Sequence, residues 1–143
     1  THSNGVKQLG TTPSGSDCLV TGATAGSAYG DNDLDGGLTS ARSPEIALPA
    51  GKSATLRLSF NVANGDNSGT DDFLRVRVVD GTTLTTVFQQ TGKAAEVDAA
   101  WRQGTADLSA FAGRSVRLLV EATDAGTPSL FEAQVDDLTV TTD

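Results

Sequence analysis

Histidine, cysteine and methionine are nearly absent from this sequence, and their absence removes several classes of chemistry. The 143 residues contain one histidine, His2, one cysteine, Cys18, and no methionine. A Ser–His or Cys–His catalytic pair and an H-E-x-x-H zinc site both require histidine within the folded part of a chain. A thiolate zinc cluster requires several cysteines. These sites are therefore excluded, whereas a glycosidase built from two carboxylates stays open because eighteen Asp and Glu residues are present.

Aromatic and basic side chains are also few. The chain has one Trp, one Tyr and five Phe, whereas a cleft that binds sugar rings normally presents several aromatic faces. We therefore expect no catalysis within this chain. Ten Lys and Arg residues stand against eighteen Asp and Glu residues, which gives a net charge of −8. A surface for nucleic acid needs the opposite balance, so nucleic acid is not expected as a partner.

Long apolar runs are missing as well. No stretch of 18 or more apolar residues occurs, so the sequence predicts no transmembrane helix and no membrane partner. The first residues lack the apolar core of a signal peptide, and the sequence is expected to be a mature fragment. The lone Cys18 lies beside Leu19 and Val20. This position favours a buried free thiol, while a disulfide to a partner outside this sequence stays open.

Alternation of apolar and polar residues predicts strands over much of the chain. Leu56, Leu58, Phe60 and Val62 alternate with polar residues, and the same period of two recurs at 74–78 and 116–122. Shorter strands are expected at 18–22, 45–48, 84–89 and 105–108. Residues 93–100 are the nearest approach to a helical pattern. Many short strands between Gly, Asp and Asn turns predict an all-β fold, an antiparallel β-sandwich with little or no helix.

The N-terminal stretch differs from the rest of the chain. Residues 1–16 are rich in Thr, Ser, Gly and Pro and show no periodicity, so they are expected to form a linker or a frayed N-terminus. Residues 17–143 are expected to form a single β-sandwich domain.

A change of parity marks the last predicted strand. Phe131, Ala133 and Val135 share one parity, whereas Leu138 and Val140 share the other. A β-bulge at residues 136–137 would return both sets to the core and redirect a carboxylate.

The segment Asp31-Asn32-Asp33-Leu34-Asp35-Gly36-Gly37 places three carboxylates at alternate positions before a glycine turn. Ca²⁺ takes about six to eight oxygen ligands, and a D-x-D-x-D-G loop directs several of them to one point. The position that would hold the bidentate Glu of an EF-hand is Arg42, so the remaining oxygens must come from other segments. A solvated Asp/Asn/Gly turn is the alternative interpretation.

Two further acidic pairs, Asp71 with Asp72 and Asp136 with Asp137, offer those oxygens. We expect a structural calcium ion that joins the first long loop to the final strand. The expected metal ligands are Asp33, Asp35, the Gly36 carbonyl, Asp72, and one of Asp136 and Asp137, with Glu132 as a weaker candidate.

Tyr29 and Trp101 form a possible ligand-binding surface. Tyr29 comes directly before the acidic segment, and Trp101 lies in a predicted loop. Each also has a structural interpretation: Tyr29 covers the metal, and Trp101 closes one end of the sandwich.

Several segments, in their order along residues ~18–142, resemble jelly-roll accessory domains of secreted bacterial hydrolases, above all zinc aminopeptidases and other metallopeptidases. The matching segments are 33–39 with 43–49, 71–74, Trp101, 107–113 and 131–137. Proprotein-convertase P-domains, MAM-type domains and carbohydrate-binding sandwiches are similar in outline. The resemblance implies a β-jelly-roll with a structural calcium, located C-terminal to a catalytic domain in a secreted, extracellular enzyme.

The expected function is therefore that of a non-catalytic, calcium-binding accessory domain of a secreted peptidase, in particular an aminopeptidase. Its partner would be the catalytic domain of the parent peptidase in cis, together with protein or polysaccharide substrate. It would stabilise the parent enzyme or help it engage substrate. A carbohydrate-binding module of a secreted hydrolase and an adhesion or protein-interaction module are the alternatives.

Overall fold

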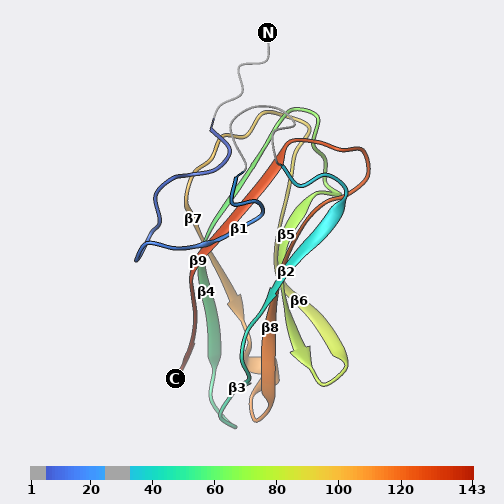
Figure 1. Cartoon of the computed structure of the whole chain (residues 1–143). Coiled ribbons are helices and arrows are strands. Elements are labelled where there is room, and N and C mark those ends of the chain that lie inside the picture. The colour runs from blue at the N-terminus through green and yellow to red at the C-terminus, as the bar shows by residue number, and fades with distance from the viewer. Residues whose placement is uncertain (1–5, 25–32) are drawn as a thin grey trace.

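The computed structural model describes residues 6–24 and 33–143, hereafter the described residues. They form two antiparallel sheets that face each other (Figure 1). The expected all-β fold, a jelly-roll sandwich, is confirmed, and its one helical element among the described residues is the 3₁₀ turn Ser109–Phe111. The strands are β1 (Leu19–Val20), β2 (Gly37–Arg42), β3 (Ile46–Ala47), β4 (Ala54–Asn64), β5 (Phe73–Asp80), β6 (Thr83–Thr91), β7 (Arg102–Asp107), β8 (Ser115–Asp124) and β9 (Phe131–Thr142).

Strand order places the first and last strands side by side. One sheet has the order β1-β9-β4-β7, and the other has the order β2-β8-β5-β6, with β3 also paired to β8. Strands β1 and β2 therefore lie at one edge of their sheets, and β7 and β6 lie at the other. None of the described residues belongs to a helix long and apolar enough to cross a membrane.

The core lies between the two sheets because each central strand directs alternate apolar side chains inward. Phe60 of β4 meets Phe88 of β6 edge to face, with ring centroids 5.0 Å apart. Gly104 of β7 makes room for this pair, since a Cβ there would lie 2.7 Å from Phe88 Cε2. The most deeply buried core residues are Leu56, Leu58, Val62, Leu74, Val76, Val78, Leu108, Val116, Leu118 and Phe131.

The predicted bulge in the last strand is present. Ser59 of β4 pairs with Asp136, whereas Arg57 pairs with Thr139, so β9 carries one extra residue between these pairs. Asp137 takes up the irregularity with a φ of 49°. As a result Val135 lies in the core and Leu138 packs against it, although the two differ in parity.

The expected linker or frayed start includes a docked segment. Residues 6–16 lie against the outer face of the four-stranded sheet, where the backbone of Leu9 exchanges two hydrogen bonds with the Gln134 amide, at 2.7 and 3.0 Å. The Asn61 side chain donates to Lys7 O at 2.9 Å. The Lys7 side chain is fully buried and pairs with Glu96 and Asp98. Polar residues of β4 and β9 are therefore buried on their outer face as well.

Candidate functional site

The acidic segment leads into β2. Asp33 is half-buried, Asp35 is exposed, and Gly36 has a φ of +57°, which the turn into β2 requires. Tyr29, Asp31 and Asn32 lie outside the described residues. Among the described residues, no group of three or more His, Cys, Asp or Glu side chains has an arrangement that would hold a metal ion.

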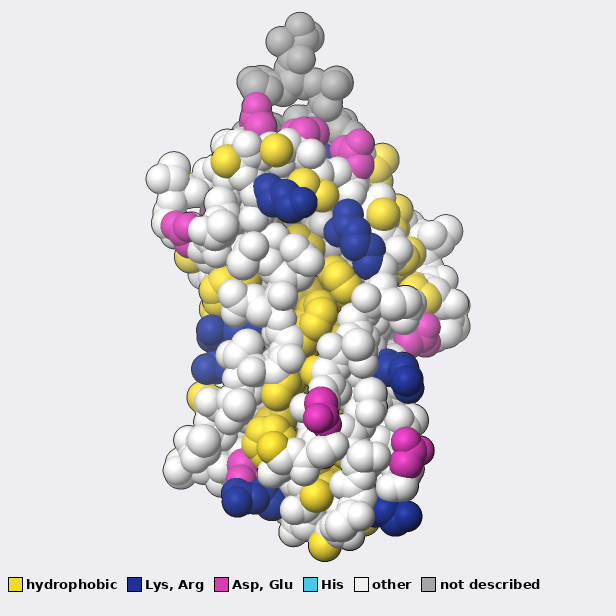
Figure 2. All heavy atoms as spheres, turned by 180° about the vertical axis from the view of Figure 1, so that it is seen from behind, with side chains coloured by type: hydrophobic (Ala, Val, Ile, Leu, Met, Phe, Trp, Pro, Cys, Tyr) yellow, Lys and Arg dark blue, Asp and Glu magenta, His cyan; other side chains and the backbone are white. Residues whose placement is uncertain are grey.

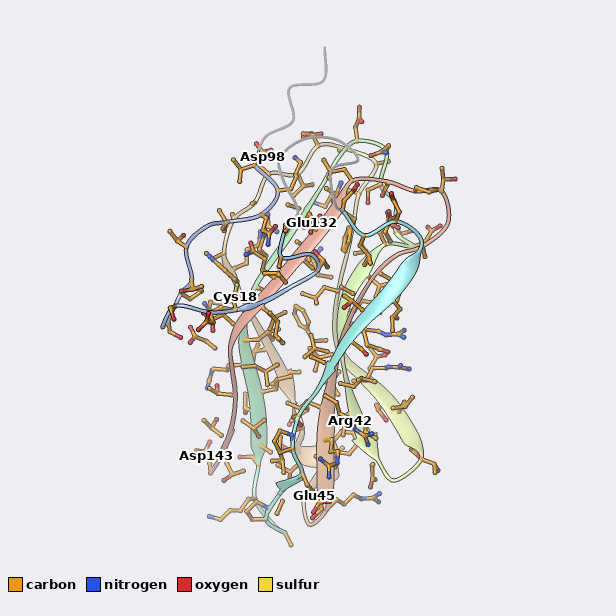
Figure 3. All side chains as sticks on the ribbon, in the orientation of Figure 1. Cys18, Arg42, Glu45, Asp98, Glu132 and Asp143 are labelled. Atoms are coloured by element: carbon orange, nitrogen blue, oxygen red, sulfur yellow. The ribbon has the colours of Figure 1, made fainter. Side chains whose placement is uncertain are left out.

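Glu132 of β9 interacts electrostatically with Asp33 of this segment. It is 1% exposed, and Figure 3 shows it in the upper part of the sandwich. One carboxylate oxygen accepts a hydrogen bond from the Thr21 hydroxyl. The other, Oε1, has no hydrogen-bond partner among the described residues. Burial raises the pKa of Glu132 to about 7, and the negative charge of Asp33 adds to the rise.

Asp72 belongs to a separate network directly before β5. Its Oδ2 accepts hydrogen bonds from Ser68 Oγ at 2.6 Å and from the Gly69 N–H at 3.0 Å. Its Oδ1 accepts one from the Ala125 N–H at 2.9 Å. Ser129 Oγ lies 3.1 Å from both Asp72 and Asp124. This buried network joins the loops at 65–72 and 125–130, and it uses the oxygens that sequence analysis assigned to calcium.

Asp136 and Asp137 hold the docked segment instead of meeting Asp72. Asp136 Oδ2 accepts a hydrogen bond from the Ser14 N–H at 3.1 Å, and the Ser14 hydroxyl donates to Asp137. Asp137 Oδ2 also accepts one from Ser59 Oγ at 3.3 Å. The predicted calcium ligands are thus distributed over three neighbourhoods, and of these only the one at Asp33 and Glu132 contains a buried carboxylate oxygen without a partner among the described residues.

Trp101 has a structural contact. It is half-buried, and its Nε1 donates to Thr11 O at 2.8 Å, which ties it to the docked segment. Cys18 is half-buried with a free thiol, and Gln134 Nε2 lies 3.6 Å from its sulfur.

The outer face of the five-stranded sheet is crossed by a charged bridge between β5 and β8. Arg75 Nε and Arg77 Nη2 each lie 2.7 Å from an oxygen of Glu121, which is 3% exposed. Burial opposes ionisation of Glu121, but the hydrogen bonds from Arg77 and Arg75 hold its pKa below the ordinary value. Arg75 also lies over the Phe73 ring, 4.7 Å from its centroid. These side chains bind one another, although the buried Arg77 Nε has no hydrogen-bond partner among the described residues.

A polar cleft lies at the β6 edge of the sandwich, where the segment 93–101 leads into β7. We call it the β6–β7 cleft. Its volume is about 190 Å³, which is small beside the roughly 300–1,000 Å³ of sites for drug-sized ligands, and it suits a single small group. It is lined by residues from β4, from β6 and from the segment that leads into β7, namely Val62, Asn64, Gln90, Thr91, Lys93, Val97 and Arg102.

Asn64 organises one wall of the β6–β7 cleft. Its buried amide donates to Gly65 O, to Lys93 O at 2.8 Å and to Ala95 O at 2.9 Å. Its Oδ1 accepts a hydrogen bond from the Lys93 N–H at 3.3 Å, and its backbone pairs with Val97. The segment 93–97 is therefore held in place without forming the helix that its composition weakly favoured.

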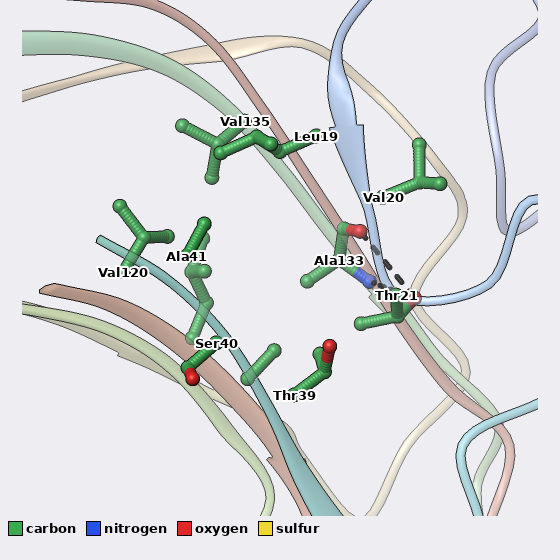
Figure 4. A pocket seen from close by; sticks show the side chains of 11 residues that line it. Leu19, Val20, Thr21, Thr39, Ser40, Ala41, Val120, Ala133 and Val135 are labelled. Carbon is green, nitrogen blue, oxygen red and sulfur yellow. Dashed lines mark hydrogen bonds between the residues drawn. The ribbon is translucent and has the colours of Figure 1, made fainter. Parts of the chain in front are cut away.

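The opposite edge holds a second, less polar cavity of about 130 Å³ (Figure 4). It lies between β1 and β2 and contains Val20, Ala41, Val120 and Ala133 among its walls. Two hydrogen bonds between the Thr21 hydroxyl and the Ala133 backbone lie beside it. Three hydroxyl residues, Thr21, Thr39 and Ser40, also line it, but no charged or carboxamide side chain does.

Comparisons with known proteins bear on the fold alone. No protein-family model matches this chain, and no curated protein matches it significantly. One similar solved structure is described as "CBM4 structure and function"; it shares 19% identity over 74% of this chain, and the TM-score is 0.45. This chain spans 61% of that structure's length.

Two further structures cover more of the chain. One is the carbohydrate-binding module CBM6cm-2 from Cellvibrio mixtus lichenase 5A in complex with cellotriose, at 15% identity over 85% of this chain and 86% of that one, with a TM-score of 0.38. The other is a CBM35 from Cellvibrio japonicus Abf62, at 19% identity over 87% of this chain and 88% of that one, with a TM-score of 0.33. At these values the likeness assigns no ligand and no site.

Proposed function

We propose that this chain is a non-catalytic carbohydrate-binding domain and that the β6–β7 cleft is its sugar site. The supporting observation is the lining of the cleft, in which a carboxamide, a hydroxyl, an ammonium and a guanidinium group converge on a space that fits one sugar residue. Sugars are recognised by such convergent polar groups. This function was the first alternative to the peptidase accessory domain.

The other surfaces fit a sugar less well. The docked segment 6–16 covers the outer face of the four-stranded sheet, and Trp101 donates its indole N–H to that segment. The outer face of the five-stranded sheet carries the closed bridge of Glu121 with two arginines. These contacts favour the edge cleft over a flat aromatic platform.

Binding of soluble polysaccharides in affinity gel electrophoresis tests this proposal. Gln90→Ala and Thr91→Ala should each reduce retardation several-fold, because each removes a polar group from the cleft. Thr85→Ala is the matched control, since Thr85 is exposed on the same strand but does not line the cleft. If Trp101→Ala abolishes binding while the two cleft variants bind normally, the sugar site lies near Trp101 and the docked segment, and not in the β6–β7 cleft.

Calcium binding remains part of the proposal, with its centre moved to Glu132 and Asp33. The free Oε1 of a buried carboxylate beside a second carboxylate is the chemistry that a hard cation satisfies. A bound cation would also relieve the cost of ionising Glu132 in a buried position. Asp72, which is surrounded by hydrogen-bond donors, is no longer needed as a ligand.

Thermal melting in EDTA, followed by addition of calcium or magnesium, tests the cation. Calcium should raise the midpoint more than magnesium, and Glu132→Gln should remove this response. Asp35→Ala should lower stability in calcium by about 1–3 kcal/mol if the acidic segment contributes to the site. An equal midpoint in EDTA and in calcium would show that no cation stabilises the fold and that the acidic segment is a solvated turn.

Attachment to a catalytic domain of a secreted peptidase rests on the sequence resemblance alone. In that setting the domain would hold the enzyme at an extracellular polymer or stabilise it. Peptide turnover by the parent with and without this domain, measured free in solution and on insoluble polymer, tests the role. Loss of turnover in solution would favour stabilisation of the parent over polymer binding.

A further inference from the structure

Two positive charges converge on the β6–β7 cleft of this acidic chain. Lys93 and Arg102 both line it, and neither forms a salt bridge with a carboxylate of the described residues. Of the other eight basic residues, four are paired with a carboxylate among the described residues, namely Lys7, Arg75, Arg77 and Arg114, and four are not, namely Arg42, Lys52, Arg57 and Arg117. The net charge is −8, and Figure 2 shows acidic side chains gathered at the upper end of the face seen from behind. What distinguishes Lys93 and Arg102 is therefore that both line the same cleft.

Hydrogen bonds with β4 hold the backbone of Lys93 and one edge of the Arg102 guanidinium group. Asn64 binds the backbone N–H and C=O of Lys93 through its side chain, at 3.3 and 2.8 Å. Arg102 Nη1 donates to Val62 O at 3.2 Å, which uses one edge of the guanidinium group and leaves its other N–H groups for a ligand. Val62 and Asn64, two residues apart in β4, thus contact both of the residues that carry charge into the cleft.

We infer that the β6–β7 cleft binds a carboxylate-bearing sugar, so that the ligand of this domain is an acidic polysaccharide that contains uronic acid residues. This inference rests on the proposed carbohydrate-binding function and names the ligand class for that same cleft. Arginine binds a carboxylate through two parallel N–H···O bonds. Lys93 supplies a second charge. Gln90 and Thr91 also line the cleft, and Gln90 Nε2 donates to Thr91 O at 3.1 Å, which leaves the Gln90 Oε1 to accept from a sugar hydroxyl.

The negative net charge of the chain explains why a polyanionic ligand would need Lys93 and Arg102. A polyanionic chain is repelled by a domain of net charge −8, so productive contact needs a local positive site. The attraction involves exposed side chains and is therefore screened by salt. Binding should weaken as ionic strength rises, which binding of a neutral sugar would not do.

The test compares polymers that differ only in charge. Retardation of the whole chain is measured in gels that contain polygalacturonate, the same polymer after methyl esterification, or a sulfated galactan. We expect at least tenfold tighter binding to polygalacturonate than to its ester. Lys93→Gln and Arg102→Gln should each remove most of that difference, whereas Arg114→Gln, at an exposed arginine paired with Asp80, should not. Thermal melting confirms that each variant is folded, and Lys93→Gln leaves the bond of Arg102 to Val62 O intact.

Each result decides between the two proposals. Equal binding to polygalacturonate and its ester would overturn the acidic ligand and leave the carbohydrate function in place. Stronger binding to the sulfated galactan would replace carboxylate by sulfate as the ligand group. Binding that Lys93→Gln and Arg102→Gln both leave unchanged would move the site elsewhere. No binding to these three or to neutral polysaccharides would overturn the proposed function itself.

Discussion

Asp124 provides a direct test of the electrostatics within the fold. Its side chain is fully buried at the end of β8, and it faces Asp72 across Ser129. Burial raises the pKa of Asp124 from 3.8 to about 6, the Asp72 carboxylate adds to this rise, and the hydrogen bond from the Ser129 N–H offsets part of it. Asp72 accepts several hydrogen bonds, which outweigh its own burial and hold its pKa below the ordinary value. The pair is therefore most stable with one proton, which Asp124 carries while Asp72 is ionised.

The sign and size of the effect follow from this shift. The folded protein binds the Asp124 proton more tightly than the unfolded chain, so stability falls as the pH rises from about 4 to about 6 and is level above that. The shift of about 2.2 pKa units, from 3.8 to about 6, corresponds at about 1.4 kcal/mol per unit to roughly 3 kcal/mol. Coupling to Asp72 makes about 2 kcal/mol a reasonable expectation for this group alone.

Replacement of Asp124 by Asn should therefore stabilise the protein at neutral pH. The Asn oxygen can accept the Ser129 N–H that Asp124 Oδ2 accepts at 2.8 Å, and the amide can donate to Ser129 Oγ and to Asp72. We expect a gain of about 1–2 kcal/mol at pH 7.5, which amounts to roughly 2–8 °C in the melting midpoint. The gain should vanish near pH 4, where Asp124 itself is protonated.

Urea unfolding followed by the fluorescence of Trp101, at pH 4 and at pH 7.5 in EDTA, measures both quantities. Asp71→Asn is the matched control, because Asp71 is the exposed sequence neighbour of Asp72 and should change stability by less than about 0.5 kcal/mol at either pH. If Asp124→Asn destabilises the protein at pH 7.5, then the ionised Asp124 is favourably held in the fold, and the upward shift of its pKa is refuted.

Three further substitutions test other parts of the structure. Gly104→Ala should cost about 1–3 kcal/mol because its Cβ would lie 2.7 Å from Phe88 Cε2 and 2.9 Å from a Leu58 methyl; an unchanged urea midpoint would contradict this packing. Glu121→Ala should cost about 2–4 kcal/mol by urea unfolding, since it leaves two arginines without their shared partner, whereas loss of the exposed Arg114 should cost less than about 1 kcal/mol. Lys7→Ala should speed hydrogen exchange at the Ala99 amide, which donates to Val6 O at 2.7 Å; unchanged exchange would show that the docked segment does not depend on its buried lysine.

The strands that sequence analysis predicted best are those with one apolar face. Alternation at 56–62, 74–78 and 116–122 located β4, β5 and β8, and the change of parity between Val135 and Leu138 located the bulge in β9. Such signals are local, because burial of one face requires a period of two. Strand β2 (Gly37–Arg42), by contrast, was not predicted. Its inward residues Thr39 and Ala41 are small or polar, so the alternation is weak.

Burial of polar side chains was not predictable in the same way. Asn61 and Gln134 have the parity of solvent-facing residues, yet both are at most 1% exposed. The segment that covers them has no periodicity and binds them largely through its backbone, at Lys7 O and at the N–H and C=O of Leu9. No pattern in the sequence records such a contact. The same reason explains why the aspartates at 136–137 were assigned to calcium, although they bind Ser14 of that segment.

The arrangement of surfaces limits the ways in which this domain can hold a polymer. One sheet face is covered by residues 6–16, the other is crossed by the Arg75–Glu121–Arg77 bridge, and the β1–β2 edge is largely apolar. Among the described residues, the β6–β7 cleft is a polar opening apart from these surfaces, and its volume admits about one sugar residue. A site of this size contacts a polymer at a single residue or at its end, and it forms few contacts. Its selectivity must therefore come from a strong local feature of that residue. The two cations of the cleft, Lys93 and Arg102, match a carboxylate in this respect, because a neutral ring would leave both charges without a partner.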